Sequence, residues 1–299
     1  MNLLITGATG FIGSALCFRL LEDKHNIVAL SRYPESIKEP IRGISNLKQL
    51  KGDVVFDVVV NLAGEPIADK RWSKQQKQRI SNSRLDSTQK LISYFKTLKH
   101  KPKLFISGSA IGYYGINKTD DIIDETASGD ESFSSQLCQQ WEAAALQAQT
   151  LGIRTCLLRT GIVLGKGGGA LKKMLFPFKI GLGGKIGEGK QWMSWIHLDD
   201  LVGIILYCIN QENLTGPING TSPNPVTNQE FTKILGKILK RPTLLPMPKI
   251  IVKLLMGQMG EELLLTGKKI LPIKALDAGY KFQYEKLENA LLSEISNYR

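Results

Sequence analysis

Three glycines near the start of the chain constrain its fold more than any other feature. Gly7, Gly10 and Gly13 follow the apolar run 3–5 and open an apolar-periodic segment that reaches Leu21. Gly7 permits a tight turn, Gly10 lets backbone N–H groups approach a phosphate, and Gly13 lets a helix pack closely on a strand. A glycine-rich turn alone would mean little, but the flanking strand and helix favour a dinucleotide pyrophosphate site. The residues predicted to contact it are Gly7, Thr9, Gly10, Phe11, Ile12 and Gly13.

Strands and helices alternate through the first half of the chain. The predicted strands are residues 2–6, 27–30, 57–61, 103–107 and 154–158. The predicted helices are residues 11–22, 73–98 and 134–150. The uninterrupted apolar run at 58–60 is typical of a strand buried in a parallel sheet. The polar stretch 33–52 stays unassigned. The alternation predicts an α/β fold, a Rossmann-type doubly wound parallel sheet with helices on both faces.

The regular alternation of strands and helices ends after residue 160. Glycine-rich segments at 165–169 and 181–184 bracket a short amphipathic segment, and beyond 223 prolines break the helical pattern into short pieces. We expect a strand over 191–196 and then a helix capped near Asp199 and Asp200. A smaller, mostly helical C-terminal substrate lobe follows from this pattern. The predicted division is a Rossmann domain of residues 1–164, to which 196–220 return, and a lobe of residues 165–195 and 221–299.

Composition excludes several classes of protein. No apolar stretch reaches membrane-spanning length, and Met1 leads almost directly into the first predicted strand, so we expect neither a membrane partner nor a leader. The net charge of +12 is spread along the chain without a nucleic-acid motif. It therefore favours a solvated basic surface or attraction of anionic ligands over nucleic-acid binding.

Cysteine and histidine usage bears on location and metals. The four cysteines are scattered without a CxxC pair, which favours reduced thiols and a cytoplasmic location. The three histidines lie far apart without metal-ligand spacing, so no metal site is predicted.

The end of the second predicted strand indicates which dinucleotide binds. An acidic residue there would grip a ribose 2′-hydroxyl, whereas an arginine accommodates a 2′-phosphate. This chain has Ser31 and Arg32 at that place, which suit a phosphate and predict NADP(H). An exposed surface arginine is the alternative. Small residues after the third predicted strand, Leu62, Ala63 and Gly64, are expected to form a cofactor wall, although tight packing alone could explain them.

These motifs together resemble a known family. The chain is similar to extended short-chain dehydrogenase/reductases in its TGxxGxxG motif at 6–13, its NLAG motif at 61–64 and its serine-bearing strand at 106–110. It resembles more closely the atypical nucleoside-diphosphate-sugar-epimerase-like family, through residues 61–67, 70–72, 158–165 and 195–201. Residues 267–272 and 278–280 resemble the small uncharacterised domain that closes these proteins.

The resemblance also shows what this chain lacks. Active reductases of the superfamily carry a Tyr-xxx-Lys pair on the helix after the serine strand, in which the tyrosine exchanges a proton with the substrate. Aligned through Glu142, those two places hold Ser134 and Cys138. A serine hydroxyl is far too weak an acid to replace a phenol, and a neutral thiol cannot replace an ammonium. Either the proton comes from elsewhere, or there is no such step.

Other side chains are candidates for the missing chemistry. Ser109 aligns with the superfamily's catalytic serine, and Tyr113 and Tyr114 are the nearest phenols. The competing interpretations are that the serine hydroxyl only hydrogen-bonds to the backbone and that the tyrosine rings only pack against other residues. Arg84 matches a family position implied to contact the cofactor, with a solvated helix arginine as the alternative.

Three residues are candidates for substrate contact. Glu65 and Arg71 follow a strand's carboxyl edge, and Trp192 precedes the predicted return to the Rossmann domain. A surface ion pair and a buried aromatic cluster are the respective alternatives. The expected partner is a small molecule, either anionic or a nucleotide sugar. A homodimer paired through segments 73–98 and 134–150 is a further possibility by analogy of fold.

Two functions remain open from the sequence. The first is an NADP(H)-dependent oxidoreductase or epimerase-like enzyme with a proton donor other than the usual tyrosine. The second is a non-catalytic NADPH-binding regulatory protein. The complete substrate lobe favours the enzyme.

Overall fold

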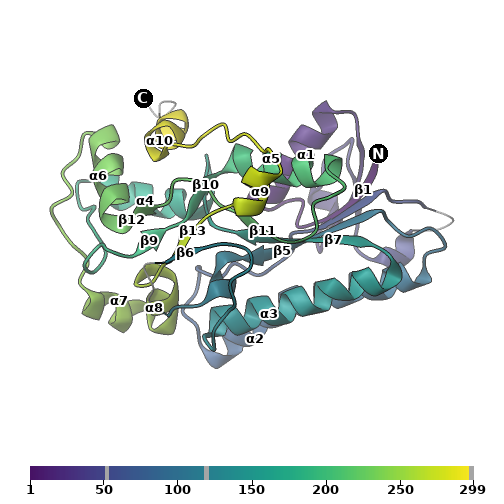
Figure 1. The fold of residues 1–299 in the computed structure, drawn as a ribbon, viewed down its shortest axis with the longest axis horizontal. Coiled ribbons are helices and arrows are strands. Elements are labelled where there is room, and N and C mark those ends of the chain that lie inside the picture. Colours follow the sequence, from purple (N-terminus) through teal and green to yellow (C-terminus); the bar gives the residue numbers. More distant parts are fainter. Residues whose placement is uncertain (51–53, 118–120, 296–299) are drawn as a thin grey trace.

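A seven-stranded parallel sheet forms the centre of the chain in a computed structural model that describes residues 1–50, 54–117 and 121–295 (Figure 1). In order across the sheet its strands are β11 (Gly216–Gly220), β7 (Arg154–Thr160), β5 (Leu104–Ala110), β4 (Val58–Asn61), β1 (Asn2–Thr6), β2 (Asn26–Leu30) and β3 (Arg42–Ile44). Leu4 of β1 lies opposite Val28 on one side and Val59 on the other. The predicted doubly wound parallel sheet is confirmed.

Two helical layers cover the two faces of this sheet. In Figure 1, α1 (Phe11–Glu22) and α5 (Leu198–Asn210) lie above it, and α2 (Lys74–Thr97) and α3 (Phe133–Leu146) lie below it. Successive side chains of a strand point to opposite faces, so Leu3 and Ile5 pack in one core cluster and Leu4 packs in the other. This alternate burial explains why β1 is apolar without interruption.

The unassigned stretch 33–52 contributes an edge of the sheet. It contains the 3-10 turns η1 (Pro34–Ser36) and η2 (Leu47–Gln49), with β3 between them. Only Ile44 of β3 is buried, so this short edge strand carries almost no periodic signal. Residues 51–53 and 118–120 lie outside the described part, as do 296–299 of the predicted C-terminal lobe.

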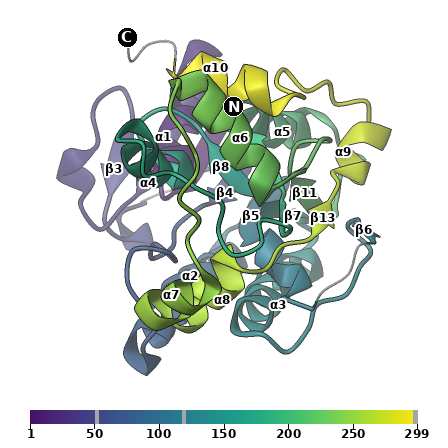
Figure 2. The same ribbon diagram turned by 90° about the vertical axis from the view of Figure 1, so that its left-hand side faces the viewer.

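Beyond the sheet, most of the remaining helices and short strand pairs lie toward the carboxyl ends of the strands (Figure 2). The helices are α4 (Gly169–Lys179), α6 (Asn228–Leu239), α7 (Lys249–Met256), α8 (Gln258–Leu264), α9 (Ile273–Asp277) and α10 (Leu287–Ile295). The short strand pairs are β6 (Ile122–Ile123) with β13 (Lys269–Ile270), β8 (Ile162–Leu164) with β10 (Trp195–His197), and β9 (Trp192–Met193) with β12 (Val226–Thr227). The single strand expected over 191–196 is therefore two strands with different partners. Two further 3-10 turns are η3 (Ile111–Tyr114) and η4 (Gln147–Leu151).

The predicted cap of α5 was wrong. His197 is the N-cap, and its Nδ1 accepts a hydrogen bond of 3.1 Å from the backbone N–H of Asp199. Asp200 is buried in the first turn, where its carboxylate accepts from the backbone N–H groups of Gln283 and Tyr284. Asp200 thus fastens a distant segment to α5, a role that local cap preferences do not indicate.

Two surface features bear on possible partners. None of the helices in the described part is long and apolar enough to span a bilayer. Across residues 1–50, 54–117 and 121–295, the large hydrophobic side chains that are exposed include none from α2 or α3. A homodimer seam on these two helices would therefore be polar.

Candidate cofactor and active site

The glycine turn joins three elements at distances that no side chain tolerates. Gly7 has φ +74°, and a Cβ placed on it would lie 2.7 Å from the backbone carbon of Leu62. A Cβ on Gly13 would lie 2.1 Å from the backbone oxygen of Gly7. The turn therefore holds the end of β1, the start of α1 and the loop after β4 in direct contact.

The start of α1 is open to a ligand. Its N-cap is Gly10, which offers no side-chain hydrogen bond to the first-turn N–H groups. The ring of Phe11 packs instead against the glycine segment 165–169, where a Cβ on Gly168 would lie 2.3 Å from the ring. The backbone N–H groups at this helix end remain suited to an anion, because they also carry the positive end of the helix dipole.

A buried hydrogen-bond chain supports the floor of this turn. The Thr6 hydroxyl donates to Asn61 Oδ1 at 2.6 Å, and Asn61 Nδ2 donates to the Thr88 hydroxyl at 2.9 Å. Trp141 Nε1 donates to the same hydroxyl at 3.0 Å, and the Thr6 hydroxyl accepts from Ala63 N. Two strands and two helices are thereby fixed at the carboxyl edge of the sheet.

Arg84 lies directly behind the loop after β4. Its Nη1 donates to the backbone oxygens of Glu65 at 3.0 Å and Ile80 at 3.1 Å, and its guanidinium lies 5.3 Å from the Trp141 ring. A Cβ on Gly64 would be 3.1 Å from the guanidinium carbon. Burial lowers the pKa of Arg84. This cation therefore supports the loop and stands near any ligand placed against it.

Ser31 and Arg32 follow β2 at the same edge. The Ser31 hydroxyl accepts from the Tyr33 N–H at 3.1 Å, and the Ser31 N–H donates to Ile44 at 2.9 Å. The Arg32 side chain is exposed and lies beside the Tyr33 ring. Both residues lie where β2 and β3 end.

Next to Ser31 lies a cavity that the sequence did not indicate. Its volume is about 840 Å³, and it opens between the segment after β3 and one face of α2. Asn46 and Gln49 form a capping box that shapes one wall, and this local motif is the only sequence signal for it. The lining residues are Leu30, Ser45, Asn46, Leu47, Lys48, Leu50, Asp86, Gln89, Lys90, Ser93, Tyr94 and Thr97.

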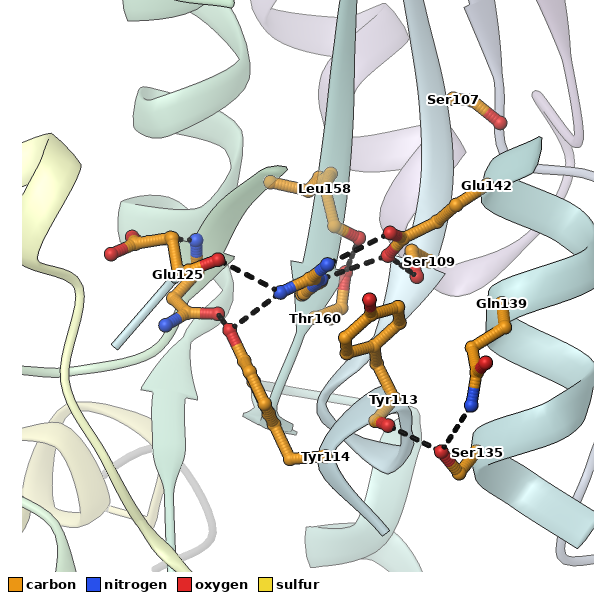
Figure 3. Close-up of polar contacts among 12 residues, drawn as sticks. Ser107, Ser109, Tyr113, Tyr114, Glu125, Ser135, Gln139, Glu142, Leu158 and Thr160 are labelled. Carbon is orange, nitrogen blue, oxygen red and sulfur yellow. Dashed lines mark hydrogen bonds and ion pairs between the residues drawn. The ribbon is translucent and has the colours of Figure 1, made fainter. Parts of the chain in front are cut away.

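A buried ion pair occupies the position where the catalytic serine was expected to act (Figure 3). Arg159 forks onto Glu142 through Nε and Nη2, each at 2.9 Å, and their side chains are 3% and 6% exposed. The Ser109 hydroxyl donates to Glu142 Oε1 at 2.6 Å. Burial alone would lower the pKa of Arg159, but the hydrogen bonds and charge of Glu142 raise it. The Ser109 hydroxyl is thus hydrogen-bonded to the Glu142 carboxylate in this structure.

The two tyrosines of η3 have different surroundings. Tyr114 is fully buried, donates to Asn219 Oδ1 at 2.7 Å and accepts from Arg159 at 3.0 Å. Burial raises its pKa to about 12. Tyr113 is half-buried, and its ring lies 3.4 Å from the Arg159 guanidinium carbon. In Figure 3 its hydroxyl end points to the side where Ser109 and Glu142 lie.

The positions of the usual Tyr-xxx-Lys pair hold a different arrangement. The Ser134 hydroxyl and N–H both donate to Glu262 Oε2, at 2.6 and 2.9 Å, so a carboxylate from α8 closes the start of α3. Cys138 is buried, and burial raises the pKa of its thiol to about 11. Cys138 is therefore a neutral packed thiol at physiological pH, as the sequence suggested.

The predicted substrate residues come from three separate segments. The Trp192 ring is half-buried beneath Lys269, whose Nζ lies 5.1 Å from the ring centre, whereas Trp195 and His197 are fully buried. Arg71 is exposed beside Gly257 at the start of α8, and no ion pair joins it to Glu65 within the described residues. Trp195 and His197 are therefore buried, whereas Trp192 stays partly accessible.

Comparisons with known proteins agree with this architecture. The model of the NAD dependent epimerase/dehydratase family matches residues 3–219, and that of a domain of unknown function, DUF1731, matches residues 247–293. The epimerase family protein SDR39U1 homolog, chloroplastic, of Arabidopsis thaliana is 38% identical over 97% of this chain and 86% of its own length. The epimerase family protein YfhF of Bacillus subtilis is 35% identical, with 99% of each chain covered.

A solved structure extends the likeness to three dimensions. The human epimerase family protein SDR39U1 (isoform 2), crystallised with NADPH, matches with a TM-score of 0.89 and 34% identity. The match covers 99% of this chain and all of the human one. The chain therefore belongs to the NAD dependent epimerase/dehydratase family, and its residues 247–293 match the domain of unknown function DUF1731.

Proposed function

We propose that this chain is an NADP(H)-dependent oxidoreductase or epimerase-like enzyme that acts on a small anionic substrate such as a nucleotide sugar. The observation that carries the proposal is the glycine turn, because Gly7 and Gly13 leave no room for side chains beside an open helix N-terminus. Such a cradle fits a pyrophosphate. The NADPH held by the human relative supports the same choice.

The residues at the sheet edge suit successive parts of the cofactor. The pyrophosphate would rest on the N–H groups from Gly10 to Gly13, with Thr9 beside them. Ser31 and Arg32 would hold the 2′-phosphate, and the adjoining cavity of about 840 Å³ would take the adenine. The loop Leu62–Ala63–Gly64, backed by Arg84, would face the rest of the dinucleotide.

Removal of one guanidinium tests the choice of cofactor. Arg32→Ala is expected to weaken NADPH binding by about tenfold to a hundredfold, because a charge-assisted contact to the 2′-phosphate is lost. NADH affinity should stay the same, since that cofactor lacks this phosphate. Calorimetric titration of the purified chain with both cofactors measures these affinities. Arg42→Ala, an exposed arginine at the opposite end of β3, is the matched control. Equal affinities of the unsubstituted chain for NADPH and NADH would contradict the assignment.

The proton donor that we propose is Tyr113. When bound, the nicotinamide supplies or accepts a hydride. Tyr113 is the more accessible phenol of η3, and Arg159 fixes its ring from one face. Tyr114 and Ser109 instead complete the buried network around Arg159 and Glu142. A substrate carbonyl above Tyr113 would receive the phenol proton, while Arg71, Glu65 and Trp192 would contact the remainder of the molecule.

A pair of phenylalanine substitutions tests this assignment. Tyr113→Phe is expected to lower kcat by about a hundredfold to ten-thousandfold, the usual contribution of general acid–base catalysis, without changing NADPH affinity. Tyr114→Phe should lower the melting temperature, because it leaves the Asn219 oxygen without its donor, but should change kcat little. Turnover of a panel of nucleotide sugars and small carbonyl compounds is followed at the absorbance of reduced nicotinamide. A full-rate Tyr113→Phe enzyme would reject the phenol as donor.

A non-catalytic NADPH-binding regulator is the second candidate function. The observation in its favour is that Ser134 and Cys138 hold neither an acid nor a cation at the usual catalytic positions. Absence of turnover on the whole panel, together with a protein partner whose affinity changes with NADPH, would favour the regulator.

Two further expectations accompany the proposal. The division into a Rossmann domain of 1–164 with 196–220, and a substrate lobe of 165–195 with 221–299, places the substrate between the two parts. A cytoplasmic location is proposed from the four free cysteines, all of which are buried as thiols.

A further inference from the structure

Two helices at the end of the molecule that is turned to the viewer in Figure 2, α4 and α7, and the loops beside them carry exposed apolar side chains, which we call the apolar strip. Four of its members are more than two-thirds exposed: Phe176 (71%), Leu244 (82%), Ile250 (77%) and Leu254 (73%). The other members of this apolar strip are Ile180, Leu182, Leu245, Met247, Ile251 and Leu255. Monomeric proteins rarely expose so many large apolar side chains together without a partner.

Hydrogen bonds join the segments that carry the apolar strip. Arg241 Nε donates to the Lys179 oxygen at 2.9 Å, which joins the end of α4 to the segment after α6. Met247 N donates to Lys185 O at 2.9 Å, and Gly187 N donates to Met247 O at 2.8 Å. The loop after α4 therefore lies alongside the segment that leads into α7.

Helix α7 has little to pack against in the chain itself. Only Val252 of its eight residues is buried, against Gly260 of α8, where a Cβ would lie 2.7 Å from the valine. Ile250, Ile251, Leu254 and Leu255 all face outward. Because helices of this length depend on packing for stability, this apolar surface calls for an external contact.

The two segments that carry the apolar strip are strongly basic. Segments 169–190 and 240–257 contain nine lysines or arginines and a single carboxylate, Glu188. The basic residues are Lys172, Lys173, Lys179, Lys185, Lys190, Lys240, Arg241, Lys249 and Lys253. Three of them pair with Asp69, Glu188 and Glu261, but these ion pairs stay about half exposed to solvent. The strip therefore fits a partner that is both apolar and negatively charged.

We propose that the apolar strip docks on an anionic lipid bilayer without crossing it. A second copy of the chain would bring the same cations face to face, so like charge opposes self-association through this surface. Its most exposed members protrude from separate segments, a geometry suited to insertion among lipid headgroups. Flanking lysines and arginines then add attraction to acidic lipids.

Docking on a bilayer would differ from the expectation, made from the sequence, that the chain has no membrane partner. The expectation of no membrane partner came from the length of apolar segments, which excludes a span but not a surface contact. The strands of the sheet run toward the same end of the molecule as α7 (Figure 1). Docking would therefore bring the carboxyl edge of the sheet close to the bilayer.

Co-sedimentation with vesicles tests the proposal on the full chain. One set of vesicles contains phosphatidylcholine alone, and the other contains phosphatidylcholine with phosphatidylserine. Binding is expected only to the second set, and it should weaken as salt concentration rises. The double variant Ile250→Ser/Leu254→Ser should lower the partition coefficient by about tenfold or more, because both apolar side chains lose their insertion. Both residues are exposed, so the melting temperature should not change.

A charge series separates lipid binding from other contacts. Lys172→Glu/Lys240→Glu should weaken vesicle binding by about tenfold or more, since each lysine near an acidic surface contributes attraction. Lys96→Glu/Lys99→Glu makes the same charge change at the far end of α2 and should leave binding unchanged.

Several results would overturn the proposal. These are no binding to acidic vesicles, equal binding to neutral vesicles, or an equal loss in the far-end control. An acidic protein would be the partner instead if polyglutamate bound as well as vesicles and the serine variant kept full affinity. Sedimentation that shows a dimer lost in the serine variant would assign the strip to a second copy.

Discussion

Replacement of Arg159 by methionine is expected to lower the free energy of unfolding by about 3–5 kcal/mol, the usual cost of removing one partner from a buried ion pair. The Glu142 carboxylate would stay buried without its bidentate partner. The Tyr114 hydroxyl and the backbone oxygen of Glu125 would also lose a donor. Urea denaturation with linear extrapolation measures the change.

Two control variants show whether the loss of stability comes from the buried charge that is left unpaired. Lys237→Met removes a surface ion pair with Glu288, in which the side chains are 75% and 47% exposed, and should cost at most about 1 kcal/mol. The double variant Arg159→Met/Glu142→Leu should recover much of the loss, since no unpaired charge remains inside. A cost below about 1 kcal/mol for Arg159→Met would mean that water reaches Glu142, contrary to the buried network described above.

The same network explains why the candidate proton donor is Tyr113 and not its neighbour. Arg159 Nη1 donates a hydrogen bond to the Tyr114 hydroxyl, whereas the Tyr113 ring packs against the guanidinium. The Tyr114 hydroxyl is therefore hydrogen-bonded within the core, whereas Tyr113 stays half-buried beside the guanidinium. Ser109 is tied to the same carboxylate, so a substrate oxygen would have to compete with Glu142 for that hydroxyl.

The fold was largely predictable because its signals are local. The apolar runs of β1 and β4 and the Gly7–Gly13 spacing each lie within a few residues of one another, and the structure confirms the sheet that they indicated. β3 escaped notice because an edge strand of three residues buries only Ile44. His197 escaped notice because cap preferences favour the aspartates that follow it.

The contacts around the candidate site were less predictable because they join distant parts of the chain. Ser134 binds Glu262 across 128 positions, and Tyr114 binds Asn219 across 105. The sequence shows that Ser134 is too weak an acid, but nothing near it in the chain indicates that its hydroxyl binds Glu262. Likewise, the cavity beside Ser31 depends on how the segment after β3 packs on α2, which no motif encodes.

Alanine at Gly13 is expected to weaken NADPH binding by at least about a hundredfold. The added Cβ would lie 2.1 Å from the oxygen of Gly7 and 2.8 Å from its carbonyl carbon, so backbone must move. The start of α1 would then leave the position in which its N–H groups face a pyrophosphate. Gly10→Ala should be milder, because its Cβ would lie 3.2 Å from the same oxygen. Calorimetric titration with NADPH gives both affinities.

Gly152→Ala separates this geometric effect from backbone strain in general. Gly152 has φ +76°, but a Cβ there meets nothing within 4 Å, and the residue lies between η4 and β7. Its alanine variant should lose about 1 kcal/mol of stability, since the conformation disfavours a side chain, and should bind NADPH unchanged. If Gly13→Ala bound NADPH as tightly as the unsubstituted chain, α1 would not hold the pyrophosphate. The cofactor would then have to bind away from this turn.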